Sequence, residues 1–406
     1  MTVSDVDPRL VAEQPGLAGA WAGFRRRLAQ GELGTLPVIV GIAIIWLIFW
    51  IANDRFLTPT NLTNLVLQIA AIGTISVGVV LVLLLGEIDL SVGALSGFAA
   101  AVMAVLNVKK GWPGWLAILA GLVAGALIGA FQGSVIALIG VSSFAVTLAG
   151  FIAWQGVIEK SITQGVIVIQ DNLVNDVTNY RFTDQTSWII AAVISAIYVA
   201  ASLANIISHR RAGLPVRNRP LVLAKLVAIP GLVFAVIGIS ANDPTRGFPF
   251  IGLLIVAMLL LWTYVAKRTT FGRHVYAVGG NAEAARRAGI NVARIRILVF
   301  MISGAMAALG GIIFAARVNG VNLASGGGDT LLNAIAAAVI GGTSLFGGRG
   351  EVRDALFGAA IIATIDNGLN IFGYSSGVIF ITTGCILLLA VTLTTVLRKR
   401  QAAAGR

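Results

Sequence analysis

Long apolar runs recur along almost the whole chain and constrain its fold more than any other feature. Hydrophobic residues make up 57% of the sequence and charged residues 11%, against roughly 25% charged residues in a soluble domain. A helix that crosses a bilayer needs about 20 apolar residues. Twelve segments fit helices in or through a membrane: 36–52, 64–85, 93–107, 113–140, 143–158, 187–208, 221–241, 248–266, 296–316, 330–347, 354–372 and 377–397. The sequence therefore predicts an all-α polytopic membrane protein with about 10–12 transmembrane or re-entrant helices.

Two of these segments, 93–107 and 330–347, are short for a membrane span. A helix of about 15 residues is roughly 22 Å long, whereas the hydrocarbon core is about 30 Å thick. We expect re-entrant or broken helices there, which occur where the backbone lines a cavity. Four glycines at a spacing of four also stand in one run: Gly121, Gly125, Gly129 and Gly133. This spacing predicts close packing against another helix.

Basic residues gather in four regions: the N-terminal tail 1–35, the loop 209–219, the loop 267–296 and the C-terminal tail 398–406. An even number of apolar segments separates each region from the next, so all four fall on one side of the membrane. The positive-inside rule places that side in the cytoplasm, with both termini. Lys109 and Lys110 fall on the opposite side. The first run, 36–52, lacks a small-residue cleavage site and is interpreted as a retained signal anchor.

The net charge of +12 does not indicate nucleic-acid binding, because no basic run is interleaved with aromatic residues. The single cysteine, Cys385, excludes an intramolecular disulfide. The polar region 161–186 is expected to be an external loop.

A short charged stretch, 279–290, interrupts the apolar pattern. Asn281 can accept a hydrogen bond from the first free amides of a helix, and Glu283 suits the positive end of the helix dipole. Gly289 can adopt the left-handed conformation that ends a helix. A chain reversal between two spans does not need such a helix. We therefore expect a surface helix that docks a soluble partner.

Polar residues next to or within the apolar runs are candidates for a solute pathway. Glu87, Asp89 and Ser91 lie beside an apolar run, where carboxylates are costly and often functional. They are expected to form a polar wall of a pathway or a tie between helices, and the alternative is a surface turn that reaches the lipid headgroups. Trp154 with Gln155 could stack on and hydrogen-bond a sugar, although such a tryptophan is more often an interfacial anchor.

A second group of polar residues has helical spacing. Asp366 and Asn370 are four residues apart and Asn367 and Asn370 three apart, so they share one helix face. Asn333 is a weaker candidate, because such residues often only satisfy hydrogen bonds between helices. The full set of pathway candidates is Glu87, Asp89, Ser91, Trp154, Gln155, Asn333, Asp366, Asn367 and Asn370.

The sequence offers no catalytic or metal-binding constellation. The two histidines, His209 and His274, both stand in basic loops, and no Cys/His set has metal-ligand spacing. A phosphate-binding P-loop requires a glycine directly before its lysine, and none of the six lysines follows a glycine. We therefore expect no enzymatic activity and no cofactor on this chain. If ATP drives transport, another chain hydrolyses it.

Several stretches, in order, resemble the permease subunit of bacterial binding-protein-dependent ABC sugar importers. These stretches are Glu87-Ile-Asp-Leu-Ser-Val-Gly93, Val146-Thr-Leu-Ala-Gly150, 271–290, 336–344 and Asp366-Asn-Gly368. The resemblance extends over about residues 36–397. It implies a pore in the bacterial inner membrane, a permease homodimer, an extracytoplasmic sugar-binding protein and a cytoplasmic ABC ATPase subunit that holds ATP and Mg.

Glu283-Ala-Ala followed by Gly289 is similar to the ATPase-docking loop of that family, although the usual Ile-Leu-Pro ending is absent. The residues that the resemblance assigns to docking are Asn281, Glu283, Ala284, Ala285, Arg286, Arg287 and Gly289.

The region 161–246 contains two apolar segments that shorter, ribose-type permeases lack, and this extension looks like the xylose branch of the family. The resemblance implies D-xylose as cargo, and another sugar or a branched-chain amino acid is the nearest alternative. An ion-coupled secondary transporter would instead use Glu87, Asp89 and Asp366 as coupling carboxylates. A membrane-embedded enzyme or scaffold is a third reading, which the lack of catalytic groups disfavours.

Overall fold

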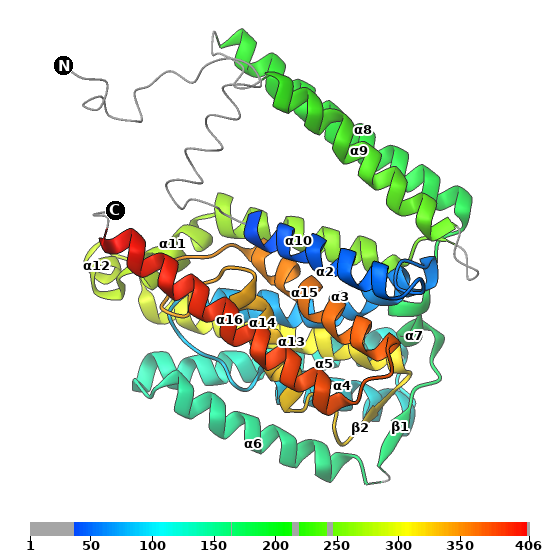
Figure 1. The fold of residues 1–406 in the computed structure, drawn as a ribbon. Coiled ribbons are helices and arrows are strands. Elements are labelled where there is room, and N and C mark those ends of the chain that lie inside the picture. Colours follow the sequence, from blue (N-terminus) through cyan, green and yellow to red (C-terminus); the bar gives the residue numbers. More distant parts are fainter. Residues whose placement is uncertain (1–35, 164, 213–218, 242–246, 404–406) are drawn as a thin grey trace, which may run out of the picture. The chain divides into compact units, whose positions relative to one another are not determined.

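The computed structural model describes residues 36–163, 165–212, 219–241 and 247–403 (Figure 1). It is all-α apart from one short two-stranded sheet, as predicted. The tail 1–35 and most of the basic loop 209–219 lie outside the described residues. Two compact units are present: residues 35–181 with 249–398, called here the main bundle, and a second unit that contains residues 182–248.

The main bundle holds most of the helices. Their bounds are α2 Leu36–Ala52, α3 Pro59–Leu84, α4 Val92–Ala104, α5 Gly114–Ser134, α6 Ser143–Ser161, α7 Asn172–Asn179, α10 Phe250–Arg268, α11 Thr270–Gly280, α12 Ala282–Arg287, α13 Val292–Val318, α14 Gly328–Ile340, α15 Val352–Ile371 and α16 Ser376–Ala403. The second unit is an antiparallel pair, α8 Asp184–Arg211 and α9 Arg219–Ala241, in which Trp188 stacks on Phe234.

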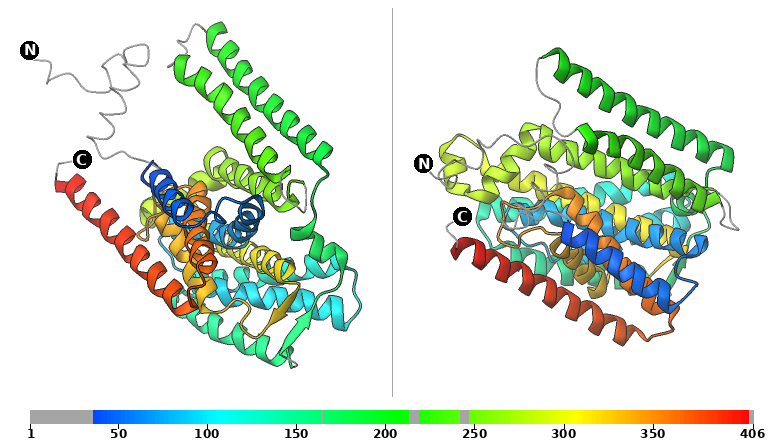
Figure 2. Two further views of the ribbon diagram at one scale, coloured as in Figure 1. Left: turned by 45° about the vertical axis from the view of Figure 1, so that its right-hand side comes forward. Right: turned by 45° about the horizontal axis from the view of Figure 1, so that its top comes forward.

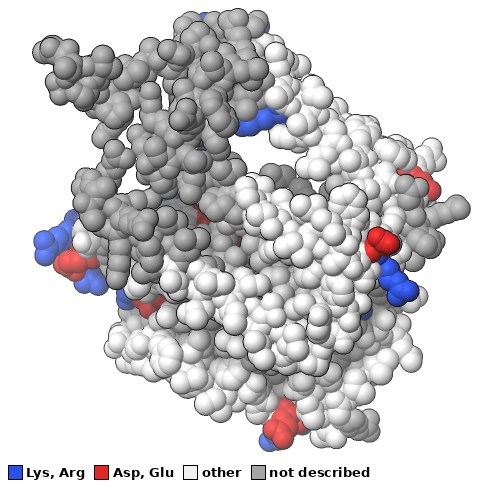
Figure 3. All heavy atoms as spheres, in the orientation of Figure 1, with Lys and Arg blue, Asp and Glu red and all other residues white. Residues whose placement is uncertain are grey.

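Each of the twelve predicted apolar segments overlaps a helix. Among the described residues, seven helices are long and apolar enough to cross a membrane: Pro59–Leu84, Val92–Lys109, Gly114–Ile139, Asp184–His209, Val222–Ala241, Phe250–Arg268 and Val292–Val318. In Figure 3, the visible face of the main bundle is almost free of charge between α12 and the α2–α3 connection. An uncharged belt of this kind fits a bilayer, so the chain is a multi-pass membrane protein.

The structure changes the bounds of three predicted segments, and for 330–347 it agrees with the expected short helix. The segment 93–107 is not short, because α4 continues through a π-helical turn, Val105–Lys109, and the combined helix is long enough to span. In 330–347, α14 ends at Ile340, because Gly342 has a φ of 122° that a helix cannot contain. α14 has 13 residues, or about 20 Å, and so remains too short to cross. α16 continues to Ala403, beyond the predicted limit at 397.

The region 161–186 is not a plain loop. Strand β1, Val166–Val168, pairs antiparallel with β2, Gly320–Asn322, with Ile167 opposite Val321. α7 follows β1, and the Asp171 side chain caps it by accepting hydrogen bonds from the amides of Leu173 and Val174. Prediction missed the sheet because its two strands are far apart in the sequence.

Helix α13 forms the centre of the main bundle and packs against α3, α4 and α5 (Figure 2). The glycine row of α5 faces it, which confirms the predicted close packing. A Cβ on Gly125 would lie 2.6 Å from the carbonyl oxygen of Gly304, and a Cβ on Gly129 would collide with the carbonyl oxygen of Phe300. Only glycine allows the two backbones to approach this closely.

The helices of the main bundle run between two ends that differ in structure. We call the end formed by residues 85–91, 269–291 and 341–351 the α12 end. There the amide of Gly348 donates a 2.9 Å hydrogen bond to the carbonyl of Leu84. The opposite end contains the sheet and α7, and we call it the β end. Lys109 lies at the β end, where its Nζ donates to the carbonyl of Ser161.

Candidate functional site

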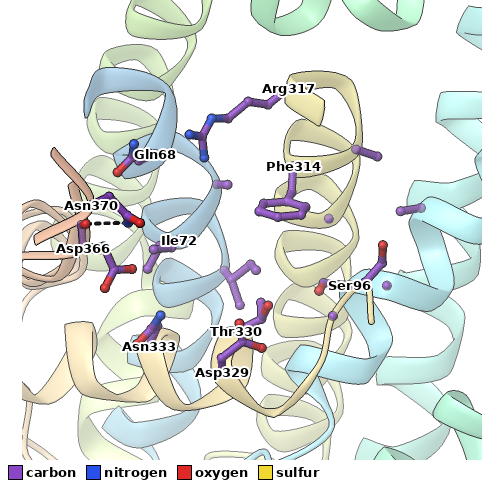
Figure 4. A pocket seen from close by; sticks show the side chains of 18 residues that line it. Gln68, Ile72, Ser96, Phe314, Arg317, Asp329, Thr330, Asn333, Asp366 and Asn370 are labelled. Atoms are coloured by element: carbon purple, nitrogen blue, oxygen red, sulfur yellow. Dashed lines mark hydrogen bonds between the residues drawn. The ribbon is translucent and has the colours of Figure 1, made fainter. Parts of the chain in front are cut away.

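A polar pocket of about 210 Å³ lies between α3, α4, α13, α14 and α15 (Figure 4). Its lining comes from the middle of α3, the first half of the helix that begins with α4, the last turns of α13 and α15, and the first turns of α14. The lining includes Gln68, Ser96, Phe314, Arg317, Ser325, Asp329, Thr330, Asn333, Asp366 and Asn370.

The polar side chains of this pocket are mostly not used to hold the fold together. Ser96 donates to the carbonyl of Gly93, and Asn370 donates to the carbonyl of Asp366 at 2.6 Å. The Ser325 hydroxyl donates to Asn322 Oδ1 at 3.2 Å. Six others form no hydrogen bond or ion pair through their side chains with any residue that the structure describes: Gln68, Arg317, Asp329, Thr330, Asn333 and Asp366. These side chains are partly or fully exposed to the cavity, so their hydrogen-bonding groups are free to contact a solute.

Three predicted pathway residues come together in this pocket: Asn333, Asp366 and Asn370. Helical spacing identified Asp366 and Asn370 because both lie on the pocket face of α15. The prediction missed Gln68, Phe314, Arg317, Asp329 and Thr330. Gln68 carried a signal, because an amide inside the apolar run 64–85 is unusual.

The remaining α15 candidate, Asn367, faces a different helix. Its Nδ2 donates to Asn61 Oδ1, and Asn61 Nδ2 donates to Asn367 Oδ1, both at 2.9 Å. This reciprocal amide pair joins α15 to α3 and leaves Asn367 5% exposed. Asn367 therefore does not line the pocket, and its amide connects two helices.

Trp154 and Gln155 lie on α6, away from the pocket. The Trp154 ring packs against Phe98, with 5.3 Å between ring centroids. Gln155 is exposed on the outer face of α6. Neither residue lines the polar pocket, so the predicted sugar-stacking role gains no support from this arrangement.

The carboxylates of the connection between α3 and α4 lie at the α12 end. Glu87 Oε1 forms a 3.0 Å ion pair with Arg296 Nη2 of α13. Asp89 is 4% exposed and accepts hydrogen bonds from the amide and hydroxyl of Ser91 and from the hydroxyl of Ser303. Of the two predicted roles, the tie between helices fits this geometry better than the pathway wall.

Ser91 extends this polar cluster to α5. Its Oγ lies 2.6 Å from Asp89 Oδ1 and 3.0 Å from Gln132 Oε1. The cluster therefore connects the α3–α4 connection with α5 and α13 through Asp89, Ser91, Gln132 and Ser303. Gln132 Nε2 is buried and has no partner among the described residues. The hydrogen bonds that are formed fix the arrangement of the helices they join.

Helix α12 has the ends that the sequence predicted. Asn281 Oδ1 accepts a 2.9 Å hydrogen bond from the amide of Ala284, which confirms it as the N-cap. Gly289 has a φ of 85°. The amide of Gly289 donates to the carbonyl of Arg286, and the amide of Ile290 donates to that of Ala285, each at 3.0 Å. These two bonds form a Schellman motif, which requires the left-handed glycine.

The side chains of α12 divide into a buried and an exposed side. Ala285 is buried and anchors the helix, whereas Ala284 is exposed. Glu283 forms ion pairs with Arg286 at 3.1 Å and with Arg287 at 3.2 Å, and all three are more than half exposed. Exposed pairs of this kind contribute little to stability. The charged side of α12 is therefore available to a partner.

Helix α11, which prediction did not foresee, joins α12 to the connection between α14 and α15. The Tyr276 hydroxyl donates a 2.8 Å hydrogen bond to the carbonyl of Gly350. Burial, with the nearby carboxylates of Glu351 and Asp354, raises the pKa of Tyr276 to about 12, so it remains a donor at neutral pH. Lys267, in the last turn of α10 just before α11, places its Nζ 2.7 Å from Glu351 Oε2. A displacement of α11 and α12 would therefore act on residues 341–351.

Residues 61–396 match the family described as the permease component of branched-chain amino acid transport systems. The chain belongs to this family of ABC importer permeases. The resemblance drawn from its sequence motifs is therefore confirmed. ATP hydrolysis resides on a partner ATPase subunit, and the permease provides the membrane pathway.

Curated relatives cover nearly the whole permease. The xylose transport system permease protein of Escherichia coli (strain K12) is 38% identical over 387 residues, which is 95% of this chain and 98% of that protein. Its counterpart in Haemophilus influenzae is 35% identical over 381 residues, 92% of this chain and all of that protein. The ribose import permease protein of Bacillus subtilis (strain 168) is 31% identical over 365 residues, 90% and 94% respectively. No solved structure matches the permease.

Proposed function

We propose that the permease imports a monosaccharide, D-xylose, across the bacterial cytoplasmic membrane. The polar pocket carries this proposal, because its free amide, hydroxyl, carboxylate and guanidinium groups suit a hydroxyl-rich solute. The identity to the xylose permeases, 38% and 35%, exceeds the 31% to the ribose permease and favours the pentose xylose.

In this proposal, solute passes the pocket residues Asn333, Asp366 and Asn370. Glu87, Asp89, Ser91 and Asn367 have a structural role in holding the helices that move. Asp366 is the one proposed coupling carboxylate that lines the pocket, and it serves there as a hydrogen-bond acceptor for solute. The family membership favours ATP-driven import over the ion-coupled alternative.

The cytoplasmic ATPase docks at helix α12. Its exposed charged side, with Glu283, Arg286 and Arg287, supplies polar contacts to the ATPase, and Asn281 and Gly289 hold the helix in shape. The α12 end then faces the cytoplasm together with both termini. The β end faces outward, where an extracytoplasmic sugar-binding protein delivers the solute.

The permease is further proposed to work as a homodimer. A second copy would cover the apolar groove between α14 and α16, which Leu332, Ala336, Phe380 and Leu387 line. Leu332 is 62% exposed and Phe380 54% exposed in the single chain. Closure of the two ATPase subunits on ATP would move α12, and α11 would pass this displacement to residues 341–351. Because these residues follow α14 directly, the displacement would reach the pocket.

Uptake of labelled xylose in proteoliposomes tests the proposed cargo. The permease is reconstituted with its candidate ATPase and binding protein, and unlabelled xylose, ribose, arabinose, galactose and leucine are added as competitors in turn. We expect ATP-dependent uptake that only unlabelled xylose blocks. Block by another sugar would keep sugar import and discard xylose, whereas block by leucine alone would discard sugar import.

A further inference from the structure

Several polar side chains in the pocket have no hydrogen-bond partner among the residues that the structure describes. The side chains of Gln68, Arg317 and Asn333 come from three different helices, line one cavity, and find no partner among the described residues. All three are only partly buried and line the cavity, where a solute can reach them. Their convergence from α3, α13 and α14 suits a polar ligand.

One wall of the same pocket is aromatic. Phe314 of α13 is 40% exposed although it lies within the main bundle. In Figure 4 its ring faces the pocket, with Gln68, Asn333 and Asn370 on the other side. An aromatic ring at this position suits a sugar better than it suits water. The C–H face of a sugar packs on an aromatic ring while its hydroxyl groups form hydrogen bonds at the edge.

We propose that Gln68, Phe314, Arg317 and Asn333 form a sugar-contact site in the permease itself, selective for neutral monosaccharides. This inference rests on the proposed function and adds a second selection step after the binding protein. Phe314 receives the apolar face of the sugar ring. Gln68 and Asn333 exchange hydrogen bonds with its hydroxyls, and Arg317 donates to a hydroxyl or ring oxygen.

The charges of the pocket provide the selectivity. Arg317 contributes +1, and Asp329 and Asp366 contribute −1 each, so the formal sum is −1. Two carboxylates accept hydrogen bonds from hydroxyl groups but repel a carboxylate on the solute. A sugar acid of the same size, such as xylonate, is therefore disfavoured, whereas the neutral sugar is not.

Matched variants test the site in the reconstituted three-component importer. The pocket variants are Gln68→Ala, Asn333→Ala and Phe314→Ala. Their controls are Gln155→Ala, an exposed amide on α6, and Phe131→Ala, whose ring is 65% exposed on α5. Two quantities are measured for each: the maximal rate of xylose uptake, and the stimulation of ATPase activity by the liganded binding protein.

We expect each pocket variant to lower uptake by about three- to tenfold, the usual effect of losing one good polar or ring contact. ATPase stimulation should stay within about twofold of wild type, which shows that the variant is folded and docked. The KM for xylose should not change, because the binding protein captures the sugar. Both controls should transport normally. Pocket variants that transport as fast as the controls would overturn the proposal.

Direct binding provides a readout that does not depend on transport. Saturation-transfer NMR on the full-length permease in detergent, without the binding protein, detects weak contacts with xylose. We expect a signal from xylose that Phe314→Ala weakens and Phe131→Ala does not, and a much weaker signal from xylonate. Equal signals from xylose and xylonate would refute the selectivity. Wild-type importer that fails to take up xylose would refute the proposed function, whereas normal wild-type uptake with unaffected pocket variants refutes this inference alone.

Discussion

Position 289 offers a clean test of how the end of α12 controls coupling. A Cβ added at Gly289 would meet no atom within 4 Å, so a side chain here costs nothing through collision. The whole cost comes from the backbone φ of 85°. For an L-residue this conformation costs about 1–2 kcal/mol, with asparagine the best tolerated and β-branched residues the worst. The series Gly289→Asn, Gly289→Ala and Gly289→Val therefore varies strain alone.

The magnitude follows from the two hydrogen bonds that close the helix. If valine adds about 2 kcal/mol of strain, the ratio of open to closed helix ends rises about 25-fold, since 1.4 kcal/mol is a factor of ten. Amide exchange at Ile290, measured by hydrogen–deuterium exchange of the reconstituted permease, should accelerate by that factor. Alanine should give roughly fivefold acceleration, for about 1 kcal/mol, and asparagine less. ATPase stimulation should fall in the same order.

Gly280 provides the matched control on the other side of α12. A Cβ there also meets nothing within 4 Å, but its φ is not in the left-handed region. Gly280→Val should leave exchange at Ile290 and ATPase stimulation close to wild type. The reasoning would be refuted if Gly289→Val exchanged like wild type, or if both valine variants had equal effects.

Three further changes probe the rest of the main bundle. Asn281→Ala removes the 2.9 Å N-cap bond of α12 and should cost about 1 kcal/mol, seen as faster exchange in α12 that Asn281→Asp restores. Gly129→Leu drives a side chain into the backbone of Phe300, so we expect a loss of about 1–3 kcal/mol and a lower Tm, whereas Gly156→Leu, which meets nothing within 4 Å, should leave Tm unchanged. Tyr276 has a pKa raised to about 12, against about 10 in the unfolded chain, so its stabilisation is complete below about pH 10 and lost as pH rises through 12. The difference in Tm between wild type and Tyr276→Phe should stay constant from pH 6 to 9 and shrink above 10; a difference that already varies at neutral pH would contradict the raised pKa.

The apolar pattern predicted every helix of the membrane region because the bilayer leaves so few choices. A chain segment in hydrocarbon must satisfy its own backbone hydrogen bonds, so a long apolar run becomes a helix. The ends of α12 were equally predictable, since Asn281 and Gly289 act through their own backbone and nearest neighbours. Helices and helix ends can therefore be predicted from neighbouring residues without knowledge of the tertiary structure.

Features that depend on distant residues escaped prediction. The sheet pairs Ile167 with Val321, and each strand is only three residues long, which is too short for a recognisable alternation of apolar and polar residues. The pocket is lined by Gln68, Phe314 and Asn333, which lie on three different helices. The spacing of residues along one helix cannot predict which residues of other helices lie next to it. For the same reason Trp154 and Gln155 were chosen as candidates: their residue types fit a sugar site, but they lie on α6, away from the pocket.

The most direct test of the account is the energy source of transport. Accumulation of labelled xylose is measured in proteoliposomes that contain the permease, its ATPase and its binding protein, with and without ATP and an ionophore. The account predicts uptake that requires ATP and all three proteins and that continues after the ion gradients collapse. Uptake by the permease alone that stops when the ionophore is added would contradict it.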